Sequence, residues 1–175
     1  MRGDLHTTAS SAEYYTNEYV FEALGCRFDL DPASPGKDVV PWIPADRHFT
    51  IVEDGLTQDW GDDLVFLNFP YTKDATPLWA EKFRKHGNGV ALCVDRTSTG
   101  WWQDLCGNAD LILQVNKKIN FIRPDGESGN NALGSTFVAY GMRGVEALMS
   151  HGHDADAPGR DHRRGSAGES VLCST

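Results

Sequence analysis

The stretch "DDLVFLNFPY", residues 62–71, ends an apolar run in a group of residues that a simple turn does not need. The run at residues 64–67 has the length and composition of a buried strand. It stops at Asn-Phe-Pro-Tyr, residues 68–71. Asparagine and proline are ordinary turn residues, so one interpretation is a hairpin-like turn with an aromatic residue in the core. An amide, a proline and an aromatic hydroxyl together also suit a site that holds a flat base with an exocyclic amine.

Upstream of this stretch, the pattern changes from helix to strand to loop. Apolar residues recur at helical spacing in residues 16–24, and Gly25 is a suitable helix end. Residues 26–31 alternate between apolar and polar side chains, as in a short strand. Residues 32–47 are rich in proline, glycine and aspartate, which predicts a loop, with a small strand at 48–52.

Downstream, one helix has clear signals at both ends. Thr76 is predicted to cap it, and Gly87 is predicted to end it. Its apolar stripe is predicted to consist of Leu78, Trp79 and Phe83. The remaining predicted elements are a short helix at 101–105 and strands at 89–94, 110–115, 118–122 and 135–140.

This order of elements predicts an α/β fold. Strands that alternate with helices favour a mostly parallel sheet that is covered on both faces. The strands at 118–122 and 135–140 have only a loop between them, so they are expected to pair antiparallel. In open parallel sheets, ligands bind outside the carboxyl ends of the strands. We therefore expect the polar residues that follow these strands to share one rim.

The composition bounds the type of protein. A chain of 175 residues with 40% apolar residues can form one domain with a proper core. Its apolar runs are far shorter than the roughly 20 residues that span a bilayer, and the first residues do not resemble a signal peptide. Four scattered cysteines without a C-x-x-C pair favour a reducing cytoplasm and argue against structural zinc. The net charge of −9 argues against a general polyanion binder.

The two ends of the chain are expected to lie outside the folded domain. Residues 1–12 are polar, which predicts a flexible start. Residues 151–175 are rich in glycine, alanine, serine and charge without periodicity, which predicts a disordered tail. The histidines of that tail are expected to be solvated, so no metal site is predicted. The folded domain is thus expected at residues 13–150.

Four motifs together resemble one known family. They are "FDLDPASPG" (28–36), "EDGLTQDW" (53–60), "FLNFPY" (66–71) and "DRTSTGWW" (95–102). In this order and spacing they are similar to the phage-type, Dam-like DNA adenine-N6 methyltransferases, over about residues 13–141. The resemblance implies a Rossmann-like methyltransferase sheet, S-adenosyl-L-methionine as cofactor and double-stranded DNA as partner. It also implies location in the cytoplasm, that of the host if the chain is phage-encoded.

The resemblance assigns the catalytic role to residues 68–71. The adenine amine is a poor nucleophile because its lone pair is delocalised into the ring. In the family's N-P-P-Y motif, the side-chain oxygen of asparagine and the next carbonyl hold this amine, and the aromatic residue stacks on the flipped base. Asn68 and Tyr71 match those roles, and Pro70 is retained. Phe69 stands where proline is expected; it keeps the carbonyl but loses the fixed φ angle, so restoring proline is expected to tighten the site.

The resemblance also implies a cofactor site. Asp29, Asp31 and Pro32 match the family's first strand and loop. Asp54 resembles the acidic position that recognises the adenine amine of the cofactor, although "DG" is also a plain turn. Tyr15 and Thr16 match the family's substrate-side N-terminal motif and are also assigned to the cofactor site. Asp46 is expected to contact the ribose hydroxyls, and Asn68 itself is assigned to the same site. Asn17 departs from the family, which has proline there.

The loop "DRTSTGWW" and a nearby pair of lysines are the expected DNA contacts. Arg96 is expected to contact phosphate, and Thr97 and Ser98 the DNA backbone. Lys117 and Lys118 add positive charge nearby.

Two other functions fit the same residues. The first is a methyltransferase for another planar amine or amide, such as an RNA base or a protein glutamine. The second is a non-catalytic remnant that binds cofactor or DNA, which the departures at Phe69 and Asn17 and the short glycine loop at 31–36 favour. The family-like loop at 95–102 favours DNA as the substrate.

Overall fold

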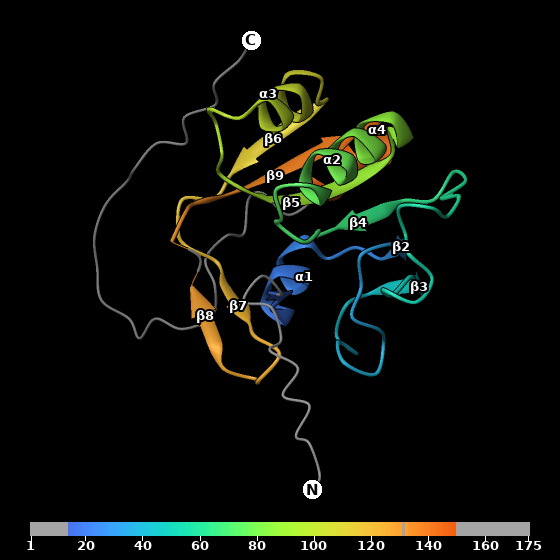
Figure 1. The fold of residues 1–175 in the computed structure, drawn as a ribbon, viewed down its shortest axis with the longest axis vertical. Coiled ribbons are helices and arrows are strands. Elements are labelled where there is room, and N and C mark those ends of the chain that lie inside the picture. The colour runs from blue at the N-terminus through green and yellow to red at the C-terminus, as the bar shows by residue number, and fades with distance from the viewer. Residues whose placement is uncertain (1–13, 131, 150–175) are drawn as a thin grey trace, which may run out of the picture.

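The computed structural model describes residues 14–130 and 132–149, which form a mixed α/β fold (Figure 1). This part of the chain contains a six-stranded sheet, a three-stranded sheet and four helices. The predicted flexible start at 1–12 and the predicted tail at 151–175 lie outside the described residues. Within them, no helix combines the length and the apolar character that crossing a membrane requires.

The larger sheet is mostly parallel and has one antiparallel strand. Its strands lie in the order β3-β2-β4-β5-β9-β6. Their bounds are β2 Phe28–Asp31, β3 Ala45–His48, β4 Val65–Leu67, β5 Gly89–Val94, β6 Leu111–Gln114 and β9 Ser135–Tyr140. β3, β2, β4 and β5 run parallel, whereas β9 runs antiparallel to both of its neighbours, β5 and β6. β6 therefore runs in the same direction as β5.

Helices cover both faces of this sheet, as the sequence predicts. The helices are α1 Glu18–Leu24, α2 Ala75–His86, α3 Gly100–Gly107 and α4 Gly141–Met149. α1 and α4 pack in one core cluster with Phe66 of β4. α2 and α3 pack in a second cluster with Val65 and Leu67, whose side chains point to the opposite face. Because both faces are covered, every residue of β4, β5 and β9 is buried.

The smaller sheet corrects one predicted strand pairing. β7 Asn120–Ile122 lies between β1 Tyr15–Thr16 and β8 Ser128–Asn130, antiparallel to both. The predicted pairing of 118–122 with 135–140 is therefore wrong. The burial pattern explains the difference: every residue of β9 is buried, so this strand takes a central position, whereas β7 buries only Phe121 fully and suits a sheet with one covered face.

Several predicted details also differ in the structure. The strand predicted at 48–52 lies at β3 instead, and Ile51 and Val52 are 93% and 85% exposed in the loop that follows. Asp74, not Thr76, is the N-cap residue of α2; the buried Thr76 hydroxyl donates to the Pro70 carbonyl at 3.4 Å. Leu78 is exposed rather than part of the apolar stripe. Gly87 ends α2 in the left-handed conformation, as predicted.

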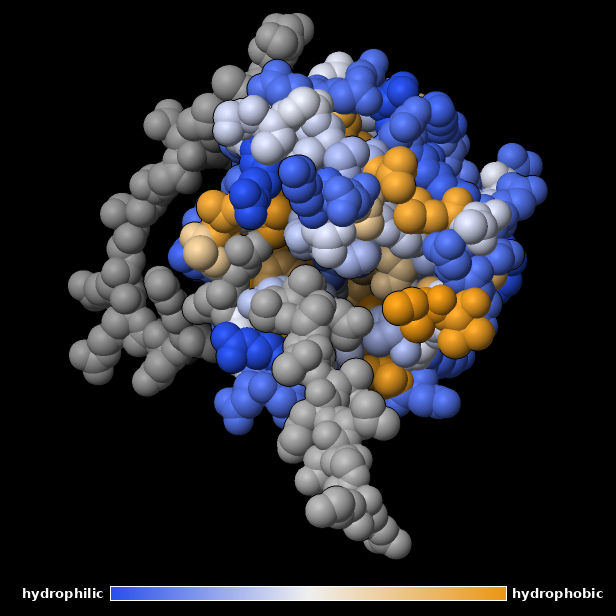
Figure 2. All heavy atoms as spheres, in the orientation of Figure 1, coloured by the Kyte–Doolittle hydropathy of each residue, from blue (hydrophilic) through white to orange (hydrophobic). Residues whose placement is uncertain are grey.

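On the face of the molecule that Figure 2 shows, the described residues form a mostly polar surface with separate apolar patches. Ile51, Val52 and Val39 are among the exposed large apolar residues. Ile51 and Val39 also line the pocket described next. Part of the exposed apolar surface thus belongs to the mouth of a cavity.

Candidate active site

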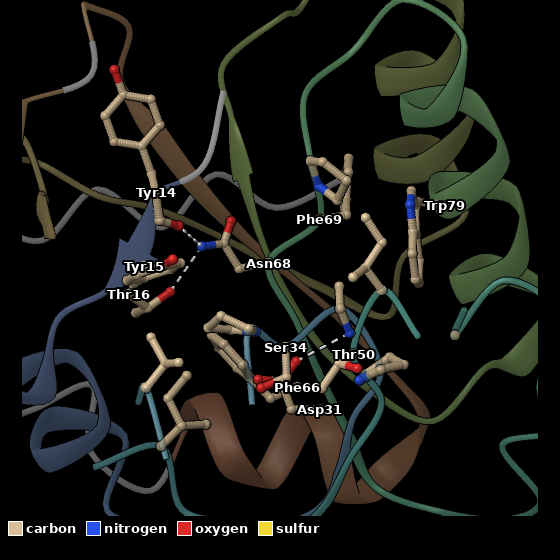
Figure 3. Close-up of a pocket in the computed structure, with 18 of the residues that line it drawn as sticks. Tyr14, Tyr15, Thr16, Asp31, Ser34, Thr50, Phe66, Asn68, Phe69 and Trp79 are labelled. Carbon is tan, nitrogen blue, oxygen red and sulfur yellow. Dashed lines mark hydrogen bonds between the residues drawn. The ribbon is translucent and has the colours of Figure 1, made fainter. Parts of the chain in front are cut away.

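A pocket of about 610 Å³ lies at the carboxyl ends of β2 and β4 (Figure 3). Three segments contribute to it: residues 31–35 at the end of β2 and in the loop that follows, residues 50–56 after β3 and residues 68–71 after β4. β1 adds Tyr15 and Thr16 from the smaller sheet. The volume falls within the range of about 300–1,000 Å³ that is usual for small-molecule sites. The strand-end position is the one that the parallel sheet predicts.

The amide of Asn68 has a defined orientation. Its Nδ2 donates to the Tyr14 carbonyl at 2.9 Å and to Thr16 Oγ1 at 3.1 Å. A backbone carbonyl only accepts hydrogen bonds, so the nitrogen side of the amide must face β1. Figure 3 shows the oxygen of Asn68 on the other side, away from Thr16. Asn68 lines the pocket, and its two hydrogen bonds through Nδ2 leave Oδ1 as the acceptor that this side chain can offer at the end of β4.

Tyr71 is anchored by its hydroxyl group. Tyr71 Oη donates to the Leu92 carbonyl at 2.8 Å and accepts from the Val94 N–H at 3.3 Å. Burial raises the pKa of this hydroxyl well above its usual value. The hydroxyl thus stays protonated and bonded to β5, while the ring remains partly exposed and lines the pocket. What Tyr71 offers to a ligand is a fixed aromatic ring.

The ring of Phe69 is a core group. It is 1% exposed and packs against Tyr71 at a centroid distance of 5.0 Å and against Trp101 at 6.0 Å. Phenylalanine at this position therefore fills space between the loop after β4 and α3. This packing of the Phe69 ring was not predictable from its backbone role in the motif.

Asp31 is a buried carboxyl group in the pocket wall. It is 3% exposed, and its Oδ1 accepts from the Ala33 N–H at 3.3 Å. Burial raises the pKa of Asp31 to about 7, against the smaller opposing effects of hydrogen bonds from Ala33 and Ser34. His48 lies nearby, with its Nδ1 3.9 Å from Asp31 Oδ2. Burial lowers the pKa of His48, so the imidazole is neutral near pH 7 and does not offset a charge on Asp31.

Two of the pocket loops touch at Gly55. A Cβ atom at this position would lie 1.9 Å from the Pro32 carbonyl oxygen and 3.1 Å from Trp79. The preceding residue, Asp54, has a φ of 52°, a left-handed conformation that aspartate tolerates better than most residues. Asp54 Oδ1 accepts from the Leu56 N–H at 3.2 Å. The Asp-Gly pair therefore forms a turn and also lines the pocket, so the two readings of "DG" are compatible.

The structure places most of the predicted cofactor and catalytic residues together. The predicted residues that line the pocket are Tyr15, Thr16, Asp31, Pro32, Asp54, Asn68, Phe69, Pro70 and Tyr71. Asp29 and Asp46 do not line it. Asp29 accepts from the Leu64 N–H at 2.7 Å and forms an ion pair with Arg143, while the exposed Asp46 is paired with Arg27.

The predicted DNA contacts also lie outside the pocket but at the same edge of the sheet. Arg96, Thr97 and Ser98 are exposed in the loop that follows β5. Lys117 and Lys118 are exposed in the loop that follows β6. Because β5 and β6 run in the direction of β2 and β4, both loops leave the edge that carries the pocket.

Some pocket residues were not singled out by the sequence analysis. Tyr14 contributes a backbone carbonyl, which gives no side-chain signal. Ser34 lies within the quoted "DPASPG" segment, and its Oγ is 2.9 Å from His48 Nδ1. Gly55 had a signal in the Asp-Gly pair, but the close approach to Pro32 depends on tertiary contacts. Among the described residues, no group of three or more His, Cys, Asp or Glu side chains is arranged to hold a metal ion.

The fold and the pocket define an α/β protein with a cavity at the carboxyl ends of parallel strands. The family model described as DNA N-6-adenine-methyltransferase (Dam) matches residues 4–146. The chain therefore belongs to the DNA N-6-adenine-methyltransferase family. Comparison with curated proteins and with solved structures finds no match.

Proposed function

We propose that the protein is a site-specific DNA methyltransferase that transfers a methyl group from S-adenosyl-L-methionine to adenine N6. Family membership supports a DNA adenine-N6 methyltransferase. The observation that carries the proposal is the orientation of Asn68, whose two N–H groups are held by the Tyr14 carbonyl and the Thr16 hydroxyl, which leaves its oxygen as an acceptor for a ligand in the pocket. An acceptor in this position suits an exocyclic amine.

The pocket residues fit the cofactor. Asp31 provides a buried carboxylate for the ammonium group, and Asp54 at the opposite loop can accept from the adenine amine. Val39, Ile43 and Ile51 give apolar surface for the adenine ring. When bound, the cofactor supplies a methyl group that its sulfonium already activates. The parallel strands that carry these loops are consistent with the Rossmann-like methyltransferase sheet that we propose.

The loop after β4 is proposed to hold the target adenine. Asn68 Oδ1 and the Phe69 carbonyl accept the two N–H groups of the amine, which directs the nitrogen lone pair toward the methyl group. The ring of Tyr71 stacks on the base, which has been flipped out of the duplex. As the nitrogen–carbon bond forms, the carbon–sulfur bond breaks, and the amine loses one proton to solvent. Positioning supplies most of the rate enhancement, so no strong base is required.

Double-stranded DNA is proposed to lie across the edge that carries the pocket. Arg96 in the loop after β5 and Lys117 and Lys118 in the loop after β6 are exposed at this edge and can neutralise phosphates. Thr97 and Ser98 are proposed to donate hydrogen bonds to the same backbone. Among the other predicted residues, Tyr15 is assigned to the cofactor side of the pocket. The positions of Asp29 and Asp46 outside the pocket favour structural roles for both.

The test of this proposal is methyl transfer with a labelled cofactor to three substrates. Purified protein is incubated with labelled S-adenosyl-L-methionine and with double-stranded DNA, an RNA of the same sequence, or a glutamine-containing peptide. We expect N6-methyladenine in the DNA only, identified by mass spectrometry of the digested product. If label appeared only in the RNA or only in the peptide, the substrate would be RNA or protein and not DNA. Cofactor binding without transfer to any of the three would support a binding remnant instead.

A further inference from the structure

We propose that Thr16 is a positioning residue that acts through Asn68, rather than a cofactor contact. Its hydroxyl and the Tyr14 carbonyl form a clamp that holds the Asn68 amide with its oxygen facing the substrate amine. This inference rests on the proposed function, because it assigns a role within the same site. It replaces the cofactor-binding role that is predicted for Thr16 from the sequence.

The geometry of the amide leads to this role. An asparagine side chain has one donor end and one acceptor end, which are related by a 180° rotation about the terminal bond. Asn68 Nδ2 lies 2.9 Å from the Tyr14 carbonyl oxygen and 3.1 Å from Thr16 Oγ1, so both of its N–H groups have partners. The rotated amide would bring two oxygens together at Tyr14 and would lose a donor at that position. The clamp therefore selects the rotamer that presents Oδ1 to the pocket.

Thr16 is itself rigidly held. It is 1% exposed, and in the small sheet it pairs with Phe121 of β7. Its carbonyl accepts from Trp42 Nε1 at 2.9 Å. Backbone pairing on one side and the indole on the other fix the position of the hydroxyl. Through Thr16, the small sheet contacts the end of β4 at Asn68, which lies 52 positions further along the chain.

The position of Thr16 explains why a hydroxyl is required there. A valine has nearly the same shape but cannot accept a hydrogen bond, so Thr16→Val leaves one Asn68 N–H without its partner. Thr16→Ser keeps the acceptor and removes only a methyl group. These two substitutions separate the hydroxyl from the packing of the side chain.

The first experiment observes the clamp without any reaction. The side-chain NH₂ signals of Asn68 are assigned by two-dimensional ¹H–¹⁵N NMR through their absence in Asn68→Asp. We expect both protons to exchange slowly in the wild type, and we expect one of them to shift and exchange faster in Thr16→Val but not in Thr16→Ser. Unprotected protons in the wild type, or no change in Thr16→Val, would overturn the clamp. The wild-type measurement stands even where a variant fails to fold.

Thr136→Val is the matched control for this experiment. Thr136 is 0% exposed and its hydroxyl donates to Asp95 at 2.6 Å, but it does not line the pocket. This substitution also removes a buried, hydrogen-bonded hydroxyl. The Asn68 signals should keep their positions and protection in Thr136→Val. A shift as large as that in Thr16→Val would mean that general loosening, rather than the clamp, is observed.

The second experiment separates positioning from cofactor binding. If Thr16 acts through Asn68, Thr16→Val lowers kcat by about 10–100-fold through misalignment of the amine, while the Kd of the cofactor and the KM for DNA stay close to wild type. Thr16→Ser should recover most of the rate. If weaker cofactor binding accounted for the whole loss of activity in Thr16→Val, Thr16 would be a cofactor contact and the proposal would be overturned. Protected Asn68 protons in a wild type that transfers no methyl group would refute the proposed function but leave the clamp standing.

Discussion

At the scale of single residues, the ionisation of Asp31 links the pocket to the stability of the fold. Its pKa of about 7 in the folded state lies about three units above the value of about 3.9 in an unfolded chain. Between about pH 4 and 7, the folded protein therefore holds a proton that the unfolded chain has lost. The free energy of unfolding falls as pH rises through this window, by about 4 kcal/mol at most.

Asp31→Asn should remove this decrease in stability. The asparagine side chain at position 31 is neutral at every pH. The free energy of unfolding of the variant, relative to wild type, should therefore rise from about pH 4 to 7 and level off above pH 7. The same variant should bind S-adenosyl-L-methionine more weakly, because the ammonium group loses its carboxylate. Urea unfolding at several pH values and calorimetric titration measure the two effects.

Asp29→Asn is the control for the effect of pH. The hydrogen bond from Leu64 lowers the pKa of Asp29, so this carboxyl is ionised in folded and unfolded chains above about pH 5. Its substitution should change stability by an amount that does not vary between about pH 5 and 8. If the difference in unfolding free energy between Asp31→Asn and wild type were also independent of pH, the assigned pKa of Asp31 would be contradicted.

Phe69 gives a second prediction at this scale. From sequence alone, Phe69→Pro is expected to stabilise the loop by about 0.4–1 kcal/mol, because proline restricts the unfolded chain. The structure reverses this expectation, because the substitution removes a ring that is 1% exposed and packed against Tyr71 and Trp101. Phe69→Pro should lower the free energy of unfolding by about 3–5 kcal/mol, as other large-to-small core substitutions do.

Phe69→Leu is the matched variant for this test. Leucine retains much of the buried volume, so the loss should be smaller, about 1 kcal/mol. Chemical unfolding curves give both values. A Phe69→Pro variant as stable as wild type would show that the ring contributes little and that the expectation from sequence was correct.

At this scale, the polar residues of the site were predictable and their surroundings were not. Asn68, Asp31 and Asp54 follow strands or lie in a marked turn, and the rule that ligands bind at strand ends is sufficient to group them. Asp46 was expected nearby but is exposed and paired with Arg27. Its position depends on where β3 begins, and the apolar pair Ile51 and Val52 made that boundary hard to read.

At the scale of elements, the contact between two pocket loops depends on Gly55. Gly55→Ala would place a methyl group 1.9 Å from the Pro32 carbonyl oxygen, so the loop at 50–56 and the loop at 31–35 must separate. Since both loops line the pocket, we expect cofactor affinity to fall about tenfold or more, which corresponds to roughly 1.4 kcal/mol of lost binding energy. Calorimetric titration measures the affinity, and the melting temperature should fall as well.

Gly107→Ala is the matched control at the end of α3. A Cβ atom there meets nothing within 4 Å, and the residue does not line the pocket. Alanine is favoured over glycine within helices by about 0.5–1 kcal/mol, so this variant should be at least as stable as wild type and should bind cofactor equally well. Cofactor affinity in Gly55→Ala equal to that in Gly107→Ala would mean that the loop contact does not shape the pocket.

Elements with strong local signals were predicted well. β5 was predicted at its observed bounds, and the glycines after α1 and α2 end these helices as expected. α4 was missed because its sequence contains Gly141 and Gly144, which lower helix propensity. The reason for Gly144 is tertiary, since a Cβ atom there would lie 2.3 Å from the Gly89 carbonyl oxygen of β5. Local pattern cannot reveal such close packing of a helix on a strand.

At the scale of the whole molecule, the charge distribution predicts how DNA binding depends on salt. The chain carries a net charge of −9, and the proposed phosphate contacts are three residues, Arg96, Lys117 and Lys118. Each neutralised phosphate contributes about −0.9 to the slope of log K against log salt, so we expect a slope of about −3. Fluorescence anisotropy with duplex DNA at several salt concentrations measures it.

Arg96→Ala should make this slope shallower by about 1. Lys85→Ala is the matched control, because Lys85 is exposed in the last turn of α2 and pairs with Glu81. α2 runs back from the pocket edge of the sheet, so its last turn lies toward the opposite edge. Lys85→Ala should leave the slope unchanged. If the slope changed equally in Arg96→Ala and Lys85→Ala, the DNA would not bind specifically at the loops after β5 and β6.

The central claim is that Asn68 holds the reacting amine, and Asn68→Ala tests it most directly. The measurement is the single-turnover rate of methyl transfer from labelled S-adenosyl-L-methionine to duplex DNA, together with the Kd of the cofactor for the same preparation. We expect the rate to fall by about 10²-fold or more, because one N–H of the amine loses its acceptor, while the Kd stays close to wild type. An Asn68→Ala variant that transfers methyl groups to adenine as fast as wild type would contradict the account.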